Sequence, residues 1–425
     1  MQRIFLVAVL WLACPMLSTS LQLSSDPIAP RRQMLQTLGG GIASTWIGAR
    51  FIEQPAFADD TAGMNSRSTM NVAAYQVIPD QGPNLNPTLQ SLNPADLFRQ
   101  VSSQGGALWL GEHHNSAKDH AMQAQILTSI HEARQNHPGK TKLDAPVAIG
   151  LEQVEVQFQP VLDDYSAGKL TSSQLRQGVE WDKRWTWPFE LYEPVFEKAR
   201  AYGMPLIALN VNTEDLAFVE ADGLPGLPRD RMRAYIADTT GFARFASTRA
   251  FSTYIDYVVL PSYEMHAALG LLRYSRNGQP LQQEMSFRNF LSGRILWDEA
   301  MASRAAAWTR ANPGGLLVGL VGADHVKFRN GIPGRYARIK ATEQQQSDQE
   351  SVVNTGCTSI LLNPTLIDSR PSGTVGMEGA DSSHPDTITL QLRYLKDDID
   401  RNSPDRSLAS STGGVLPLAD YLLIG

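Results

Sequence analysis

Cysteine is almost absent from this chain of 425 residues, since only Cys14 and Cys357 occur. With Cys14 inside an apolar leader, the remaining chain has one thiol, which excludes an internal disulfide and a cysteine-ligated zinc site. Basic residues are not in excess either, because the formal net charge is −6. No basic stripe is visible, so we expect no nucleic-acid partner.

Several familiar motifs are also missing. The chain has no P-loop, no G-x-G-x-x-G, no H-E-x-x-H and no G-x-S-x-G, so the common nucleotide sites and two common hydrolase classes are not indicated. Beyond the leader, no segment is long and apolar enough to span a membrane.

The first 58 residues resemble two targeting elements in series. Residues 1–20 carry Arg3 and a short apolar stretch, as in a secretory signal peptide. Residues 21–58 carry Arg31-Arg32 and end on Ala56-Phe57-Ala58, a twin-arginine-like segment with a peptidase site. This arrangement is similar to presequences of thylakoid-lumen proteins in algae, so we expect a plastid, thylakoid-lumen location. A bacterial-type export signal or an uncleaved anchor is the alternative.

The rest of the chain alternates strand and helix patterns. Apolar runs near 107–112, 146–152, 205–210 and 316–322 predict strands buried on both faces, as in a parallel sheet. Helical patterns near 116–135, 191–202 and 284–311 lie between them, and 211–280 is a helical insertion. The prediction is an α/β fold, with a Rossmann-like, mainly parallel sheet flanked by helices.

The domain boundaries follow from composition. Residues 59–93 are polar and lack a period, which predicts an extended arm, and 94–340 form the α/β domain. Residues 341–425 form a C-terminal extension whose short apolar runs predict two or three strands in a small antiparallel annex. Whether this extension packs on the same domain or stands alone is open.

Each strand pattern ends on a residue able to do chemistry. The carboxyl ends of parallel strands meet at one edge, where ligands bind in open α/β sheets. This edge should gather Glu112, His114, Glu152, Asn210 and His325.

The turns Gly111–His114 and Gly322–His325 share the pattern G-x-x-H. Imidazoles and carboxylates on two strand ends suit a divalent metal, with His114, His325 and Glu112 as ligands. Glu112, Glu152 and His325 are the candidate catalytic residues, since a carboxylate or imidazole can move a proton. The alternative interpretation is that the polar residues of each turn only cap the following helix.

An aromatic cluster near Trp181–Tyr192 offers a second kind of site. It is either core or a flat wall for a planar ligand, with Tyr192 as polar handle. His120, six residues after His114, either points back at the same rim or lies in solvent. Asn210 either orients a ligand or holds a loop. The candidate ligand-binding residues are Tyr192, His114, His120, Trp187 and Asn210.

Ordered segments over about 105–340 resemble the ChaN-like haem-binding family, within the broader Tiki and erythromycin-esterase-like superfamily. They are Leu110–His114, Ile149–Glu152, Gln159-Pro160, Phe189–Tyr192, Ala208–Asn210, Leu296–Met301, Gly322–His325 and Gly331–Pro333. The chain departs from the bacterial pattern because it lacks a lipoprotein cysteine after its leader and has longer 212–290 and C-terminal regions.

The resemblance implies a Rossmann-like domain and two functions. Bacterial ChaN-like proteins bind haem between paired subunits, so we expect haem or a related tetrapyrrole as ligand, with an axial Tyr192, His114 or His120, and a possible homodimer. Tiki-type relatives are metal-dependent proteases and erythromycin esterases are hydrolases, so a metal-dependent hydrolase with a divalent metal ion is the alternative. A non-catalytic scaffold with a relic pocket is the third possibility.

Overall fold

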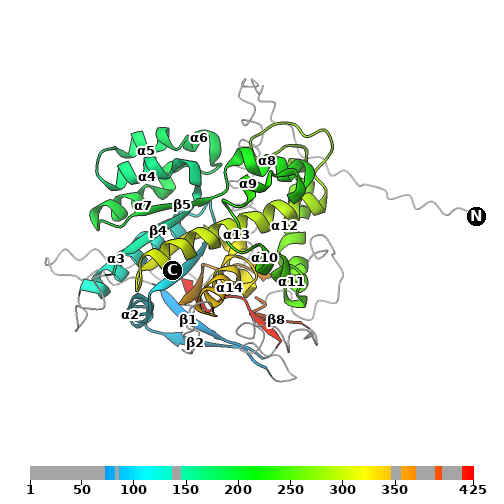
Figure 1. The fold of residues 1–425 in the computed structure, drawn as a ribbon. Helices are drawn as coiled ribbons and strands as arrows, with labels where there is room; N and C mark the ends of the chain where they lie inside the picture. Colours follow the sequence, from blue (N-terminus) through cyan, green and yellow to red (C-terminus); the bar gives the residue numbers. More distant parts are fainter. Residues whose placement is uncertain (1–71, 82–85, 136–144, 346–355, 370–387, 395–413) are drawn as a thin grey trace, which may run out of the picture.

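The computed structural model describes residues 72–81, 86–135, 145–345, 356–369, 388–394 and 414–425 (Figure 1). The expected targeting segments, residues 1–20 and 21–58, lie outside these residues. No helix in the described part is both long and apolar enough to cross a membrane. The strands are β1 (Ala73–Ile78), β2 (Thr88–Leu92), β3 (Gly106–Glu112), β4 (Val147–Glu155), β5 (Leu206–Asn210), β6 (Leu316–Gly322), β7 (Cys357–Leu362), β8 (Gln391–Arg393), β9 (Val415–Pro417) and β10 (Tyr421–Ile424).

The helix that begins at Pro94 starts where a local signal predicts. The Asn93 side chain caps this helix by accepting a hydrogen bond from the Ala95 backbone N–H, and Pro94 occupies the first helical position. In the described residues the α-helices are α2 (Pro94–Gln104), α3 (Ala117–Gln135), α4 (Gln159–Ser166), α5 (Ser172–Gly178), α6 (Trp181–Arg184), α7 (Phe189–Ala201), α8 (Thr213–Asp222), α9 (Arg229–Met232), α10 (Thr239–Phe245), α11 (Arg249–Tyr254), α12 (Leu260–Ala268), α13 (Phe287–Ala311) and α14 (Ile332–Gln345).

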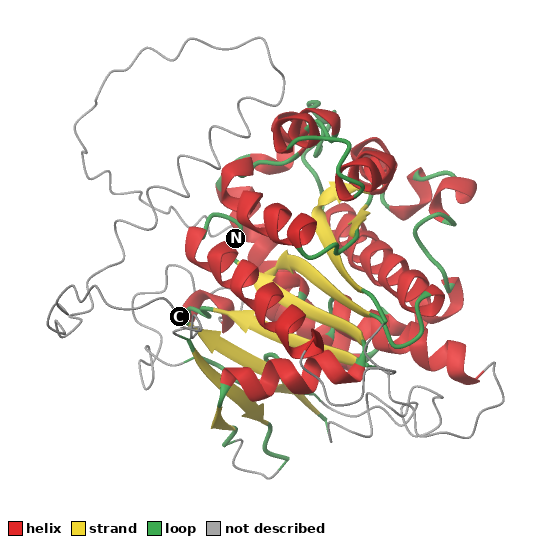
Figure 2. Cartoon of the chain, turned by 90° about the vertical axis from the view of Figure 1, so that its left-hand side faces the viewer, coloured by secondary structure: helices red, strands yellow, loops and turns green. Residues whose placement is uncertain are grey.

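One sheet of eight strands runs through the centre in the order β2-β1-β10-β7-β3-β6-β4-β5. The six strands from β10 to β5 are parallel to one another, whereas β1 is antiparallel to both β10 and β2. The predicted α/β class and mainly parallel sheet are therefore confirmed. Figure 2 shows helices on both sides of the strands.

The alternation of side chains along each strand decides which helices cover it. On β3, Leu108 and Leu110 pack with the apolar residues of α2, α3 and α7. Ala107 and Trp109 point the other way and pack with α13 and α14. Because both faces of the strand are buried, its sequence is a continuous apolar run rather than an alternating one.

The extended arm expected at residues 59–93 was wrong for its described part. Residues 73–78 and 88–92 are strands β1 and β2, joined in antiparallel register from Ala74 opposite Leu92 to Ile78 opposite Thr88. The sequence pattern did not indicate β2 because it is an edge strand with little apolar character. All its residues except Leu92 are exposed.

The expectation of a small antiparallel annex was also wrong in part. β7 and β10 of the C-terminal extension join the main sheet in parallel register, and only β8 and β9 form a two-stranded antiparallel sheet. Gly106 and Gly356 make this join possible, since a Cβ on Gly106 would lie 2.0 Å from the Gly356 carbonyl oxygen. A larger residue would push β7 away from β3.

Candidate functional site

The expected convergence at the carboxyl ends of the strands is present. β3 ends at Glu112, directly opposite Gly322 at the end of β6. β4 carries Glu152 and lies on the other side of β6, with Asn210 at the end of β5 beyond it. This edge of the sheet is called the rim below.

Glu112 continues the face of β3 that α3 and α7 cover, and its side chain is buried. One carboxylate oxygen, Oε1, accepts hydrogen bonds from Tyr192 Oη at 2.7 Å, His114 Nδ1 at 2.9 Å and Gln153 Nε2 at 3.2 Å. The other oxygen accepts from Gln123 Nε2 at 2.5 Å. Four donors therefore satisfy a charge that would be costly to bury alone.

Glu152 lies on the opposite face of the sheet, because Ile149 and Leu151 of the same strand point toward α3 and α7. Its Oε2 accepts from the Gly322 backbone N–H at 2.6 Å. Its Oε1 lies 3.3 Å from His325 Nε2 and 3.8 Å from His114 Nε2.

Asp298 of α13 completes the row of charges by bonding His325 Nδ1. Carboxylates and imidazoles thus alternate across the rim in the order Asp298, His325, Glu152, His114 and Glu112. The G-x-x-H pattern of both turns places each histidine between two carboxylates, and this row can hold and move protons.

The electrostatics keep both glutamates ionised. Burial acts to raise the pKa of Glu152, but the charges of His325 and His114 and the Gly322 N–H outweigh it, so the pKa lies below its usual range. Burial likewise acts to raise the pKa of Glu112, yet the His114 hydrogen bond and the charge of His120 hold it below its ordinary value.

His325 is the cation of this row. Burial and the neighbouring Arg294 lower its pKa, but Glu152 and Asp298 raise it further, and the result is a pKa above the ordinary histidine value. His325 is buried, whereas the side chain of His114 is 24% exposed. His114 is therefore the imidazole of the row that a ligand can reach.

Tryptophans surround His114. The Trp185 ring meets it edge-on at 5.0 Å between centroids, and the Trp187 ring stacks at 6.2 Å with 30° between the planes. On its far side is Gly322, where a Cβ would lie 2.8 Å from His114 Nε2. The glycine of the second turn thus leaves room for the histidine of the first.

Tyr192 and His120 lie behind the rim rather than on it. Both are buried, and their rings are 4.0 Å apart between centroids. Besides its bond to Glu112, Tyr192 has a hydroxyl whose pKa burial and the charge of Glu112 raise well above its usual value, so it stays protonated. His120 Nε2 bonds the His114 carbonyl oxygen at 3.1 Å. This placement makes each a support for Glu112 and His114.

Trp187 and Asn210 have different surroundings. Trp187 is half-buried and its carbonyl accepts from Trp181 Nε1 at 2.9 Å. Asn210 is buried, and its Nδ2 donates to the Glu152 carbonyl at 2.7 Å, so it fixes the strand end that carries Glu152.

A metal site is not formed by this arrangement. Among the residues that the structure describes, no group of three or more His, Cys, Asp or Glu side chains is arranged to hold a metal ion. The physical reason is that the candidate ligands bind one another. His114 Nδ1 and His325 Nδ1 are hydrogen-bonded to carboxylates, and both Nε2 atoms face one oxygen of Glu152.

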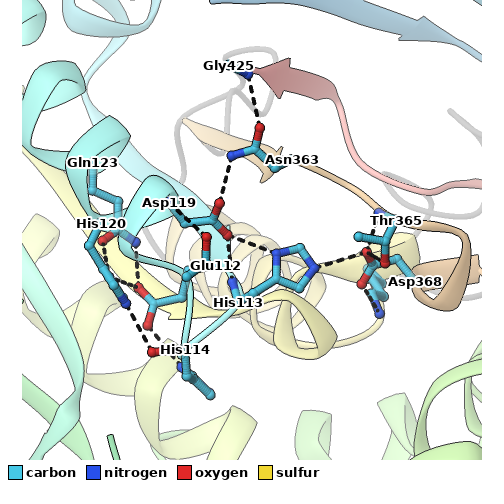
Figure 3. Close-up of polar contacts among 12 residues, drawn as sticks. Glu112, His113, His114, Asp119, His120, Gln123, Asn363, Thr365, Asp368 and Gly425 are labelled. Carbon is cyan, nitrogen blue, oxygen red and sulfur yellow. Dashed lines mark hydrogen bonds and ion pairs between the residues drawn. The ribbon is translucent and has the colours of Figure 1, made fainter. Parts of the chain in front are cut away.

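His113, the other histidine of the first turn, serves a second network (Figure 3). Its ring lies between Asp119 of α3, at 2.9 Å, and Asp368 of the C-terminal extension, at 3.1 Å. Lys327 also pairs with Asp368 at 2.8 Å, and Asn363 donates to Asp119 at 2.7 Å. This network ties the extension to the rim.

The sequence reading missed four residues at the site. Gln123 and Gln153 bond Glu112, and Arg276 and Arg294 lie near Trp297 and Asp298. Gln153 follows Glu152 on a strand, so its opposite orientation could have been read from the period of two. Nothing in the pattern signals Arg276, which comes from a distant loop.

An open, mainly parallel sheet with charged side chains at its strand ends is an α/β architecture, and folds of this kind bind ligands at that edge. The family model described as "Haem-binding uptake, Tiki superfamily, ChaN" matches residues 99–335. Because this match covers more than half of the chain, the chain belongs to that family.

Three further similarities are weaker. "Protein RETICULATA-RELATED 5, chloroplastic" of Arabidopsis thaliana is 26% identical over 211 residues, which are 46% of this chain and 25% of that protein. The chain thus spans about a quarter of that relative. The structure described as cofacial heme binding to ChaN of Campylobacter jejuni has a TM-score of 0.45 at 13% identity, covering 83% of this chain and 96% of that one. A mutant of erythromycin esterase EreC has a TM-score of 0.35 at 12% identity, covering 82% and 97%.

The His113 network predicts a pH-dependent stability. Burial acts to lower the pKa of His113, but Asp119 and Asp368 raise it to about 10. A raised pKa contributes stability that is complete below the ordinary value of 6.5 and is lost as the pH rises through about 10. Urea midpoints should therefore fall more between pH 6.5 and 10 in the wild type than in His113→Gln. His131→Gln is the control, and equal slopes in all three proteins would contradict the network.

Proposed function

We propose that this chain binds haem or a related tetrapyrrole at the rim, where His114 would hold the iron. The observation that carries the proposal is the partly exposed His114 imidazole between the Trp185 and Trp187 rings. Family membership supports it, since the matching model is described as haem-binding uptake.

The residues present fit a haem. Metal-binding histidines usually donate their second N–H to a carboxylate, and His114 Nδ1 does so to Glu112. That bond leaves Nε2 as the nitrogen for an iron, with Glu152 Oε1 3.8 Å away, and Trp187 offers an aromatic face beside the ring. Bound haem would supply an iron that accepts the imidazole lone pair.

Tyr192 and His120 take positioning roles in this proposal instead of the axial role expected from the sequence. The Tyr192 hydroxyl is bonded to Glu112 and could reach an iron only after that bond breaks. Glu112 in turn holds His114. Asn210 bonds the Glu152 backbone carbonyl, so it too positions a neighbouring residue and does not contact the ligand itself.

A haemin titration of the purified protein tests this function. The wild type should shift and sharpen the Soret band with saturation, and His114→Ala should weaken binding at least about tenfold because the axial bond is lost. His131→Ala is the matched control, since His131 lies on α3 and stacks on Tyr202, away from the rim. Sedimentation of the loaded protein tests whether the haem also recruits a second copy. Absence of a Soret shift, or one unaltered in His114→Ala, removes the proposal.

Hydrolysis is a second candidate, and the convergence of His114 Nε2 and His325 Nε2 on Glu152 favours it. An ionised glutamate beside an exposed imidazole can accept a proton from water. The divalent metal expected from the sequence does not fit the donor set as arranged, because no metal-holding group is formed in the described residues.

Turnover of an ester and peptide panel, with and without added manganese, cobalt or zinc, tests this candidate. Glu152→Gln should lower the rate about a hundredfold or more because the proton acceptor is lost. His131→Gln should leave the rate unchanged. No turnover under any metal, together with no metal by elemental analysis, would count against hydrolysis.

For location we propose the plastid, and within it the thylakoid lumen. The chloroplastic name of the Arabidopsis relative and the serial leader at residues 1–58 support this proposal. Fractionation of intact plastids checks it, and recovery of the protein wholly outside them would contradict it.

A further inference from the structure

Arg276 lies in a tight hairpin of the helical insertion, and this hairpin lies beside the rim. The hairpin, Tyr274–Pro280, is closed by a β-bridge between its ends and by a hydrogen bond of 2.9 Å from the Ser275 N–H to the Gln279 carbonyl. Glu220 of α8 accepts from the Arg276 backbone N–H at 2.5 Å. The backbone is therefore fixed at the residue whose side chain reaches the site.

The Arg276 guanidinium lies between two aromatic faces. It is 5.4 Å from the Trp185 ring centre and 5.2 Å from the Trp297 ring centre. Cation–π contacts on two rings hold the group in place. No hydrogen bond or ion pair of this guanidinium is found within the described residues, and the residue is half-buried, so its N–H donors remain available to a ligand.

The same two tryptophans flank the histidines of the rim. Trp185 meets His114 edge-on at 5.0 Å, and Trp297 meets His325 edge-on at 5.4 Å. Arg276 is thus one aromatic ring away from each imidazole. A ligand at His114 that extends toward His325 would meet this guanidinium.

Arg294 adds a second cation on the His325 side. It precedes Trp297 by three residues on α13, so the two share a face of the helix. Its Nε lies 3.6 Å from Asp298 Oδ2, too far for a hydrogen bond, and its side chain is only 10% exposed. The buried Nε and Nη2 have no hydrogen-bond partner among the described residues, which marks a place for an acceptor.

We propose that Arg276, supported by Arg294, forms a carboxylate-binding subsite of the rim, and that the ligand is a planar molecule with a carboxylate arm. A guanidinium presents paired N–H donors that match a carboxylate. This inference rests on the proposed function, and it specifies the free-acid form of a tetrapyrrole, with a propionate directed to Arg276.

Haemin and haemin dimethyl ester test the subsite, because they differ only in the carboxylates. The wild type should bind haemin at least about tenfold more tightly than the diester. Arg276→Gln should lose this preference while its Soret shift with the diester is retained, since the ester cannot use the guanidinium. Arg276→Lys keeps the charge without the planar fork and should retain part of the preference.

Arg273→Gln is the matched control, because Arg273 is exposed and precedes the same hairpin. It should behave as the wild type. Equal affinity of the wild type for haemin and the diester, with a normal Soret shift for both, overturns the subsite and leaves haem binding standing.

A small probe separates the two proposals if the wild type binds neither haem compound. 3-Phenylpropionate carries one planar ring and one carboxylate arm, and its binding should quench tryptophan fluorescence at Trp185 and Trp297. Saturable quenching that is lost in Arg276→Gln supports the subsite even where haem binding has failed. No saturable quenching in that case overturns the subsite as well.

Discussion

The charge of Glu152 is the constraint on which the rim depends. A carboxylate buried at a strand end is costly unless it is paired and hydrogen-bonded. The Gly322 N–H and the His325 imidazolium supply those partners, and Asp298 holds His325 from behind. Removing His325 would leave the buried Glu152 charge without its imidazole partner, so the positions of Glu152 on β4, His325 after β6 and Asp298 on α13 depend on one another.

The pleat of the sheet explains how Glu112 and Glu152, on opposite faces of the sheet, both interact with His114. Glu112 points to the α3 and α7 side and Glu152 to the α13 side, and His114 at the open edge lies between them. A histidine held by carboxylates in this way has a fixed ring, and 24% of the His114 side chain is exposed. Both ligand binding and proton transfer benefit from an imidazole held in this way.

Much of the fold and of the rim followed from local pattern. Strands β3, β4, β5 and β6 and the convergence of Glu112, His114, Glu152 and His325 could be predicted, because burial on both faces leaves continuous apolar runs that end on polar residues. β2 could not, since it lies exposed at the sheet edge and carries polar side chains, and β1 was missed with it because the two pair as one hairpin. Arg276 could not either, because its place depends on how a long helical insertion folds back, which no short pattern encodes.

The protonation of His325 tests the central claim most directly. Its pKa is raised by Glu152 and Asp298 against burial and Arg294, so the imidazolium should persist above the ordinary pKa of 6.5. Nitrogen-15 spectra of histidine-labelled protein should show the ring of His325 mostly protonated at pH 6.5, with a titration midpoint above that value, and Glu152→Gln should lower the midpoint. A His325 that is neutral at pH 6.5 in the wild type would contradict the account.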